Sequence, residues 1–268
     1  MARPPSVEAG AQVLRGDGTL AIAERIAEEL PVALVYNNVV VAVMMATPAD
    51  LEDFAWGFSL GEAIVDDPDD IIAVTLRSGA TGAEIHVTVE PEAASRAGAR
   101  TRKLVGRSGC GLCGLGSLEA AVVAARPVGD ALRLRPQAVA AALAQLPDFQ
   151  PLNRETRAVH AAAWADRDGA IVMAREDVGR HNALDKLVGA MARARIRPDQ
   201  GFCVVTSRCS YEMVEKAMRA GIEVLVAVSA PTGLALRLAE QAGMTVVGIA
   251  RADAQTVFTH PQRLGLAP

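Results

Sequence analysis

Short valine-rich runs alternate with turns in the first third of the chain. Residues 31–36 and 39–45 form two such runs, and Asn37 and Asn38 join them. Because asparagine tolerates the positive φ angles of a tight turn, this pattern predicts a β-hairpin. The same alternation predicts two further strands, over residues 71–76 and 83–89.

A helix is predicted between these strand pairs. Thr47 is in position to act as its N-cap, followed by Pro48 at the first helical position. Leu51, Phe54 and Phe58 then recur at helical spacing and give the segment one apolar face. The first 90 residues are therefore predicted to be a small α+β portion.

The next stretch, residues 91–116, lacks a clear hydrophobic period. It is rich in glycine and carries a cluster of cationic side chains. We therefore predict a mobile loop. The cations are Arg96, Arg100, Arg102, Lys103 and Arg107.

Strands and helices alternate in the remainder of the chain. Helices are predicted over residues 117–125, from Pro136, and over 183–194, 210–221 and 232–243, and strands over 160–165, 170–174, 202–205, 222–228 and 244–250. Repeated strand–helix–strand units favour a mainly parallel sheet with helices on both faces and ligands at the carboxyl ends of its strands. We expect an α/β domain over residues 117–268, which can also pack with 1–90 as one domain over about 18–265.

Composition narrows the class of protein. Of the 268 residues 51% are apolar and 22% charged, as in globular proteins, and the formal net charge is −4. A general nucleic-acid binder would need a basic surface instead. No apolar run approaches the length of a membrane span, and the first ten residues do not resemble a signal peptide. We expect a soluble cytoplasmic protein without membrane association.

The chemistry suggested by the sequence begins at residues 106–114, GRSGCGLCG. Cys110 and Cys113 have the C-x-x-C spacing, and neighbouring cations such as Arg107 favour the nucleophilic thiolate. The segment also matches the dinucleotide fingerprint G-x-G-x-x-G, and the pair is spaced as in a thioredoxin-type motif. Both interpretations need a preceding strand, which is not predicted here.

Zinc binding is a structural alternative for the cysteines. It would combine Cys110 and Cys113 with Cys203 and Cys209. The downstream pair falls in and just after a predicted buried strand, and we expect Cys203 to be a core residue. No stably held metal is predicted.

Two polar segments follow predicted strands and lead into helices. In the first, EDVGRHN (176–182), Arg180 and His181 suit binding of a purine, ribose or phosphate. A capping and ion-pair network of Asp177 with Arg180 is the structural alternative. Asp185 and Lys186 are expected on a solvated helix face.

The second segment, TSRCSYE (206–212), offers Ser207 and Ser210 to a phosphate at another helix start. A hydrolase triad of Ser210, His181 and Asp177 is disfavoured, because no G-x-S-x-G elbow exists and Ser210 is explained as an N-cap. A zinc deaminase is excluded because Ala162 stands where H-x-E would place the catalytic acid.

The chain resembles the FdhD family, the accessory sulfurtransferases of formate dehydrogenase. The resemblance rests on GRSGCGLCG (106–114), EDVGRHNALDK (176–186), SRCSYEMV (207–214) and TVFTHP (256–261). It implies a cytidine-deaminase-like α/β fold and a homodimer. It also implies a sulfur carrier that receives sulfane sulfur from a cysteine desulfurase and passes it to the molybdenum cofactor, as bis-molybdopterin guanine dinucleotide, before insertion into formate dehydrogenase.

The resemblance also implies roles for particular residues. Cys110 would carry the persulfide, with Cys113 as its partner. The cofactor would contact the segment after the last predicted strand, and its nucleotides would dock near Arg180, His181, Ser207 and Ser210. That segment consists of Ile249, Ala250, Arg251, Ala252, Asp253 and Ala254.

Two departures from the family pattern affect the expected cofactor contacts. Arg157 stands where relatives often have Thr-Gly ahead of the histidine at 160, and Arg251 lies beside Asp253 where relatives can offer two cations and a glycine. Two rival functions stay open: a non-catalytic chaperone of the molybdenum cofactor, and a thiol–disulfide oxidoreductase.

Overall fold

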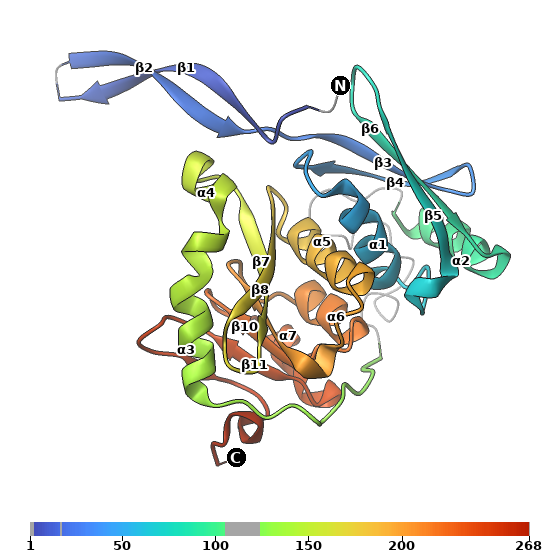
Figure 1. Ribbon diagram of the computed structural model, residues 1–268, viewed down its shortest axis with the longest axis vertical. Coiled ribbons are helices and arrows are strands. Elements are labelled where there is room, and N and C mark those ends of the chain that lie inside the picture. Colours follow the sequence, from blue (N-terminus) through green and yellow to red (C-terminus); the bar gives the residue numbers. More distant parts are fainter. Residues whose placement is uncertain (1–2, 17, 105–123, 268) are drawn as a thin grey trace.

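The protein has a mixed α/β fold built on three sheets. A computed structural model describes residues 3–16, 18–104 and 124–267. The two larger sheets and their helices form the body, and a two-stranded ribbon extends from it (Figure 1). No helix among the described residues is long and apolar enough to span a membrane.

The largest sheet has six strands in the order β12-β11-β10-β9-β7-β8. Three central strands pair in parallel, β9 (Gly201–Val205), β10 (Val224–Ala227) and β11 (Thr245–Gly248). The others pair antiparallel, β7 (His160–Asp166) with β8 (Ile171–Asp177) and with β9, and β12 (Thr256–Val257) with β11. The sheet is therefore mixed, and the prediction of a mainly parallel sheet is wrong for these pairings.

A tight turn is the physical reason for the antiparallel hairpin of β7 and β8. Gly169 has φ 89°, and a Cβ there would lie 2.1 Å from the carbonyl oxygen of Ala138. The chain reverses within a few residues, which leaves no room for the long crossover that parallel neighbours need. The likeness to cytidine deaminases that the resemblance implies stays a prediction.

Helices cover both faces of this sheet, as predicted. On one face lie α5 (Arg180–Arg193), α6 (Tyr211–Arg219) and α7 (Gly233–Ala242), packed around Trp164. On the other face α3 (Pro136–Gln145) packs against Phe202 and Val204. Successive residues of a buried strand therefore point alternately into the two cores, one on each face of the sheet.

The second sheet has four strands in the order β4-β3-β6-β5. Its strands are β3 (Leu30–Tyr36), β4 (Val39–Ala46), β5 (Ile71–Ser78) and β6 (Ala83–Val89). The hairpin prediction is confirmed, because Asn37 and Asn38 join β3 to β4 with φ 44° and φ 69°. Between β4 and β5 lie α1 (Leu51–Gly61) and the short 3-10 turn η1 (Pro68–Asp70).

Part of the predicted mobile loop is a helix. α2 (Pro91–Leu104) packs on the second sheet through Ala93 and Ala97, which are both buried. Two small residues four positions apart supply the contact, and alanine gives too weak a hydrophobic signal to stand out among the neighbouring cations. The rest of that loop and most of the predicted helix 117–125 lie outside the described residues.

The start of α1 differs from the prediction at Thr47. Asp50 holds the N-cap position, with φ 53° and no capping bond from its side chain. Thr47 is buried instead, and its hydroxyl accepts a hydrogen bond from the backbone of Val178 at 3.1 Å. The Thr47 side chain therefore binds a residue that is distant in the sequence and does not cap α1.

Two glycines allow a close crossing of α1, which packs on the four-stranded sheet, and α5, which packs on the six-stranded sheet. A Cβ at Gly57 would lie 1.6 Å from the carbonyl oxygen of Asp185, and one at Gly189 would lie 1.9 Å from that of Asp53. Only hydrogen atoms fit at the crossing, so the two backbones are in contact. This crossing joins the N-terminal α+β portion to the six-stranded sheet.

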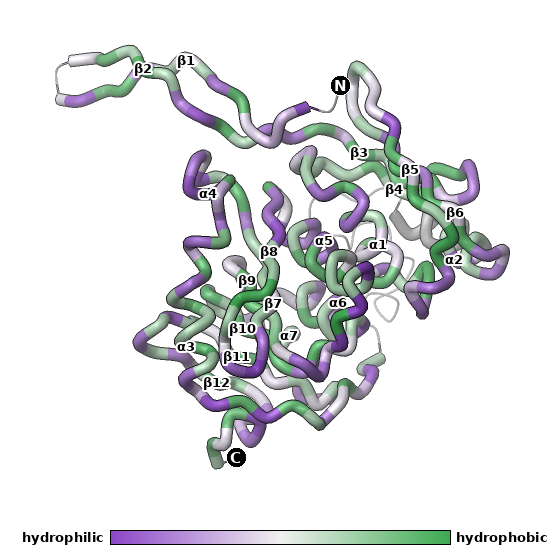
Figure 2. Tube along the Cα trace, viewed as in Figure 1, coloured by the Kyte–Doolittle hydropathy of each residue, from purple (hydrophilic) through white to green (hydrophobic). Residues whose placement is uncertain are grey.

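The ribbon of β1 (Ser6–Arg15) and β2 (Gly18–Ala27) was not predicted. It projects beyond α4 (Pro151–Thr156), and Arg25 of β2 contacts Glu155 at 2.5 Å (Figure 1). Green and purple segments alternate along it in the hydropathy view (Figure 2). Alanine and glycine occupy many of its positions, so the strand period is weak in the sequence.

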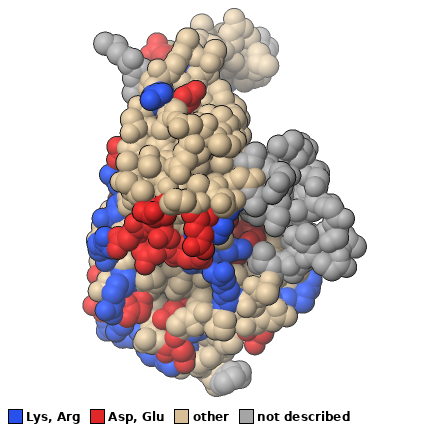
Figure 3. All heavy atoms as spheres, turned by 90° about the vertical axis from the view of Figure 1, so that its right-hand side faces the viewer, with Lys and Arg blue, Asp and Glu red and all other residues tan. Residues whose placement is uncertain are grey.

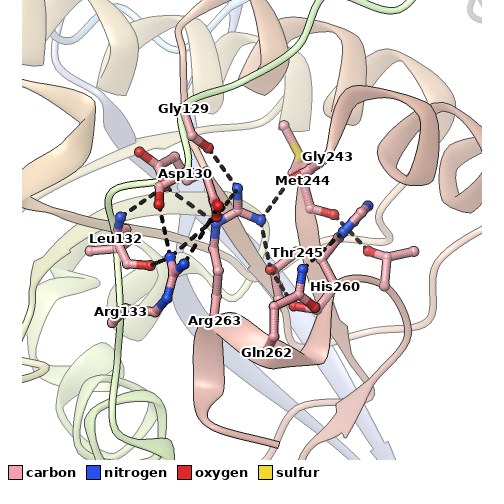
Figure 4. Close-up of polar contacts among 12 residues, drawn as sticks. Gly129, Asp130, Leu132, Arg133, Gly243, Met244, Thr245, His260, Gln262 and Arg263 are labelled. Atoms are coloured by element: carbon pink, nitrogen blue, oxygen red, sulfur yellow. Dashed lines mark hydrogen bonds and ion pairs between the residues drawn. The ribbon is translucent and has the colours of Figure 1, made fainter. Parts of the chain in front are cut away.

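A buried arginine holds the C-terminal turn η5 (Pro261–Leu264) in place (Figure 4). Arg263 is 2% exposed, donates to the carbonyl oxygens of Gly243 and Gly129 at 2.6 Å each, and pairs with Glu223 at 3.3 Å. Glu223 directly precedes β10, and Thr245, another Arg263 contact, begins β11. This cluster therefore braces the amino ends of the strands, opposite the edge where ligands are expected.

The surface carries charges of both signs side by side, as the face in Figure 3 shows. Ion pairs among exposed side chains include Arg195 with Asp69 at 2.6 Å and Arg193 with Glu52 at 2.7 Å. Paired surface charges of this kind contribute little to stability.

Candidate functional site

The predicted site residues converge on one edge of the six-stranded sheet. Strands β8, β9, β10 and β11 end there, and the antiparallel strand β7 begins there. Arg180 and His181 follow β8, and Ser207 and Ser210 follow β9. The segment 249–254 follows β11, so all the predicted binding residues share this edge.

A pocket of about 430 Å³ opens at the same edge. Leu143, Leu146, Val159 and Val228 contribute apolar walls. Polar side chains also line it: Gln150, Asn153, His160, Thr206 and Arg251. Its volume and its few polar groups on apolar walls are typical of a small-molecule site.

Only part of the predicted cofactor segment lines this pocket. Ala250, Arg251 and Ala252 do, whereas Ile249, Asp253 and Ala254 lie beside it. Arg180, His181, Ser207 and Ser210 are not among its lining residues, although they share the sheet edge. Gln150, Asn153 and His160 were missed as site residues. His160 begins a strand at this edge, which is the signal that could have identified it. Thr206 belongs to the segment 206–212 that was predicted to bind phosphate.

Arg251 stands at the mouth of the pocket. Its side chain is exposed, and Nη1 donates to the carbonyl oxygens of Val228 and, at 2.9 Å, Ala250. Its backbone N–H donates to Ala254 at 2.7 Å, which closes a tight loop. The guanidinium is thus held between the ends of β10 and β11, where an anionic group entering the pocket would meet it.

The two helix starts are linked to each other. His181 at the start of α5 pairs with Glu212 at the start of α6, with 3.0 Å between Nε2 and Oε2. Ser210 holds the N-cap position of α6 as predicted, but its side chain makes no capping bond and its buried Oγ has no partner among the described residues. The hydroxyl of Ser207 donates to the carbonyl of Arg208 at 3.0 Å.

The electrostatic surroundings of His160, which begins β7 at this edge, are positive. Burial lowers the pKa of His160, and the nearby charges of Arg180, Arg208 and His181 lower it further. Its imidazole is therefore held neutral around pH 7. A neutral imidazole can donate one hydrogen bond and accept another.

Most of the segment EDVGRHNALDK has a structural role. Asp177 accepts hydrogen bonds from the backbone of Thr47 at 3.0 Å and of Gly179 at 2.8 Å, and from Asn182 at 3.0 Å. Lys186 pairs with Asp177 at 2.7 Å, and both side chains are fully buried. The network attaches α5 to the end of β4.

Asp185 and Lys186 are therefore not on a solvated face, contrary to the prediction. Asp185 is 2% exposed and contacts Lys216 of α6 at 2.8 Å. The helix α5 is sandwiched between α1 and the large sheet, so even its polar residues point into protein. Periodicity alone cannot distinguish such a central helix from a surface helix.

Two of the four cysteines, Cys203 and Cys209, lie among the described residues. Cys203 is a core residue, as predicted, and Cys209 is also buried. Burial raises the pKa of both thiols, that of Cys209 to about 12. They are therefore poor thiolate donors to a metal or an electrophile. Cys110 and Cys113 lie outside the described residues.

Comparisons with known proteins agree with this architecture. The model of the FdhD/NarQ family matches residues 27–265. The chain therefore belongs to the FdhD/NarQ family. The match begins at the end of β2, so most of the projecting ribbon precedes the residues that the family model matches.

Individual relatives of this family are close in sequence. A protein named sulfur carrier protein FdhD from Xanthomonas campestris pv. campestris (strain B100) is 51% identical over 98% of this chain and 94% of its own length. A protein of the same name from Cupriavidus necator is 50% identical over 90% of this chain and 84% of its own.

The fold is also found in a solved structure. A crystal structure described as a formate dehydrogenase accessory protein from Desulfotalea psychrophila superposes with a TM-score of 0.77 at 26% identity. The match covers 97% of this chain and all of that chain. The mixed α/β architecture is therefore that of the family.

Proposed function

We propose that the protein is a sulfur carrier that prepares the molybdenum cofactor for formate dehydrogenase. The observation that carries the proposal is the extent of the family match, together with near relatives named sulfur carrier protein. The C-x-x-C pair in a basic segment supports it, because a cationic neighbourhood favours the thiolate that sulfur transfer requires. The expected setting is the cytoplasm, with a cysteine desulfurase as sulfur donor.

The loading step is a thiol–persulfide exchange. The Cys110 thiolate attacks the terminal sulfur of the donor's cysteine persulfide, a new S–S bond forms on Cys110, and the donor's own S–S bond breaks. The donor cysteine leaves as a thiolate, so no external oxidant or reductant is consumed. For release, the Cys113 thiolate attacks Sγ of Cys110, the bond between Cys110 and the sulfane sulfur breaks, and that sulfur leaves as hydrosulfide for the cofactor. The Cys110–Cys113 disulfide that forms is then reduced by a low-molecular-weight or protein dithiol before the next round.

The cargo in this proposal is the bis-molybdopterin guanine dinucleotide form of the cofactor. The pocket supports binding of one of its nucleotides, since its volume suits a group of that size and Arg251 places a cation at the rim. Arg180, His181, Ser207 and Ser210 lie along the same edge and would meet the parts of the cofactor that extend beyond the pocket. This cargo is too large for the pocket alone.

Intact mass spectrometry tests the loading step. The purified protein is incubated with a cysteine desulfurase and cysteine, and one added sulfur atom that dithiothreitol removes is expected. Cys110→Ala should abolish the addition, and Cys113→Ala is the matched control for loss of a neighbouring thiol. No added sulfur, or its persistence in Cys110→Ala, would overturn the proposal.

The same variants separate the two rival functions. A non-catalytic cofactor chaperone predicts that Cys110→Ser still supports maturation of formate dehydrogenase. A thiol–disulfide oxidoreductase predicts a reversible Cys110–Cys113 disulfide and reduction of generic disulfides such as insulin. The proposed homodimer, a separate part of the proposal, is checked by light scattering during size-exclusion chromatography.

A further inference from the structure

We propose that the ribbon of β1 and β2 is an arm that packs on the four-stranded sheet of a second copy of this chain. The inference rests on the homodimer of the proposed function, and it adds the two surfaces that meet. One surface lies on the ribbon and the other on the sheet. Both are apolar, and both are exposed in a single copy.

One face of the ribbon is almost entirely apolar. Residues paired across two antiparallel strands point to the same face, and every second pair shares that face. The pairs of this face, which we call the ribbon stripe, are Val7 with Ile26, Ala9 with Glu24, Ala11 with Ile22 and Val13 with Leu20. Leu20 is 56% exposed and Ile26 is 45% exposed.

The stripe lacks cover from the described part of its own copy. The ribbon's described residues do not belong to any of the three hydrophobic cores. A two-stranded ribbon is marginally stable in water by itself, and exposed ion pairs such as that of Arg25 with Glu155 contribute little. A surface that covers the stripe would therefore stabilise the ribbon.

The four-stranded sheet has an apolar face of the same kind along its edge strand β4. Val43 is 60% exposed and Met45 is 50% exposed. Their partners on β3 alternate with residues that enter the core beneath the sheet, so they point outward. This outward surface, the β3–β4 face, consists of Pro31, Ala33, Val35, Val40, Val43 and Met45.

The ribbon cannot lie on the β3–β4 face of its own copy. Only Glu28 and Glu29 separate β2 from β3, and the ribbon projects away from the four-stranded sheet (Figure 1). A two-residue link can reverse a chain within one sheet, but stacking on a second sheet also needs a step of about 10 Å. The two apolar surfaces can therefore meet only between copies.

The area of the ribbon favours a second copy over an unrelated partner. Strands of ten residues extend about 33 Å, and a two-stranded ribbon is about 10 Å wide. One face on another surface then buries about 650 Å² in total, less than the roughly 1,200 Å² of a specific interface. In a twofold dimer the contact occurs twice and buries about 1,300 Å².

The charges beside the two surfaces suit such an interface. Glu24, the charged member of the ribbon stripe, pairs with Arg157 at 2.9 Å. On the sheet, Glu84 and His86 of β6 lie 2.8 Å apart and border the β3–β4 face. Both carboxylates already have a partner, and an apolar centre with a polar rim is typical of protein interfaces.

Sedimentation analysis of the purified full chain measures the dissociation constant of the dimer. Leu20→Asp places a charge in the ribbon stripe and should raise this constant by about 30-fold or more. Leu14→Asp is the matched control, since Leu14 is 78% exposed and its pairing with Thr19 places it on the opposite face of the ribbon. Val43→Asp on the β3–β4 face should act like Leu20→Asp, and Val172→Asp, at an exposed valine of β8, is its control.

Mixing the two defective variants shows which surface meets which. In a heterodimer, the intact ribbon of the Val43→Asp copy lies on the intact face of the Leu20→Asp copy, so one of the two contacts is complete. An equimolar mixture should therefore contain more dimers than either variant alone at the same total concentration. This gain also shows that both variants fold. A dimer held by ribbon against ribbon, or by sheet against sheet, would lose affinity in only one variant.

Four results would overturn the inference: a monomeric wild type, a dimer as tight as the wild type in either variant, controls that weaken the dimer equally, or no gain on mixing. A monomeric wild type would also remove the homodimer of the proposed function. The other three would leave the homodimer and remove only the ribbon as its contact. Loading of sulfur on Cys110 is measured separately by intact mass, so its failure can be told apart from all four.

Discussion

The carboxylate of Asp177 and the ammonium group of Lys186 lie 2.7 Å apart, and neither side chain is exposed. Lys186 also donates to the carbonyl oxygen of Thr47 at 3.0 Å, and Asp177 accepts from the backbone N–H of the same residue. The pair therefore joins α5 to the end of β4. Because Arg180 and His181 belong to the same segment, that segment both supports the fold and reaches the sheet edge where ligands are expected.

Removal of one partner of this pair is expected to be costly. Lys186→Met leaves a buried carboxylate without its counter-charge, and we expect it to lower the free energy of unfolding by about 3–5 kcal/mol. Urea denaturation measures the change. Arg197→Met, which breaks an exposed pair with Asp199, is the control and should leave the midpoint nearly unchanged. Equal midpoints for the wild type and Lys186→Met would contradict this account.

The crossing of α1 and α5 gives a second prediction. Gly57→Ala places a methyl group 1.6 Å from the carbonyl oxygen of Asp185, so the helices must separate. We expect a loss of about 1–3 kcal/mol or more, measured by thermal unfolding. Gly98→Ala in α2 is the matched helical control, since a Cβ there meets nothing within 4 Å, and it should raise stability by about 0.5–1 kcal/mol. The crossing is misassigned if both variants behave alike.

The two described cysteines should be chemically silent in the folded protein. Burial raises the pKa of the Cys209 thiol to about 12, and Cys203 is fully enclosed. Iodoacetamide at about pH 8 should therefore leave a Cys110→Ala/Cys113→Ala double variant unlabelled until urea unfolds it, because the thiolate is the reactive form. Labelling is counted by intact mass. Rapid modification of either thiol under native conditions would rule out this arrangement.

His160 should make the protein less stable in mild acid. Its pKa is lowered in the folded state, so below about pH 6.5 the unfolded chain binds a proton that the folded chain resists. Stability is therefore lost as pH falls from about 7.5 towards 5. His160→Gln should flatten the pH dependence of the urea midpoint across this range. A parallel decline in the wild type and His160→Gln would exclude His160 as the cause.

Local chemistry made several elements of the fold predictable. The asparagine turn between β3 and β4, the start of α3 at Pro136, and the limits of α7 at Thr232 and Gly243 all follow from residues that act on their own neighbours. Thr232 accepts a hydrogen bond from Ala235 at 3.3 Å, and Gly243 has φ 70°. Such signals need no information about distant parts of the chain.

The errors arise where the partner is remote or the signal is weak. Thr47 was assigned to a helix cap that its contact with Val178 replaces, and Lys186 to solvent although it pairs with Asp177. The helix α2 and the ribbon of β1 and β2 were missed because alanine and glycine carry little hydrophobic contrast. In each case burial or pairing with another segment determined the outcome.

The sequence by itself determined the family and the order of most strands and helices. It also determined the edge of the sheet on which the predicted binding residues gather. These features depend on motifs, turn residues and the direction of strands. Only the tertiary structure decided which polar groups line the pocket at that edge. Gln150 and His160 reach the same pocket as Arg251 although they are about a hundred positions away. Burial and electrostatic surroundings are properties of that three-dimensional neighbourhood, and no local pattern of residues contains them.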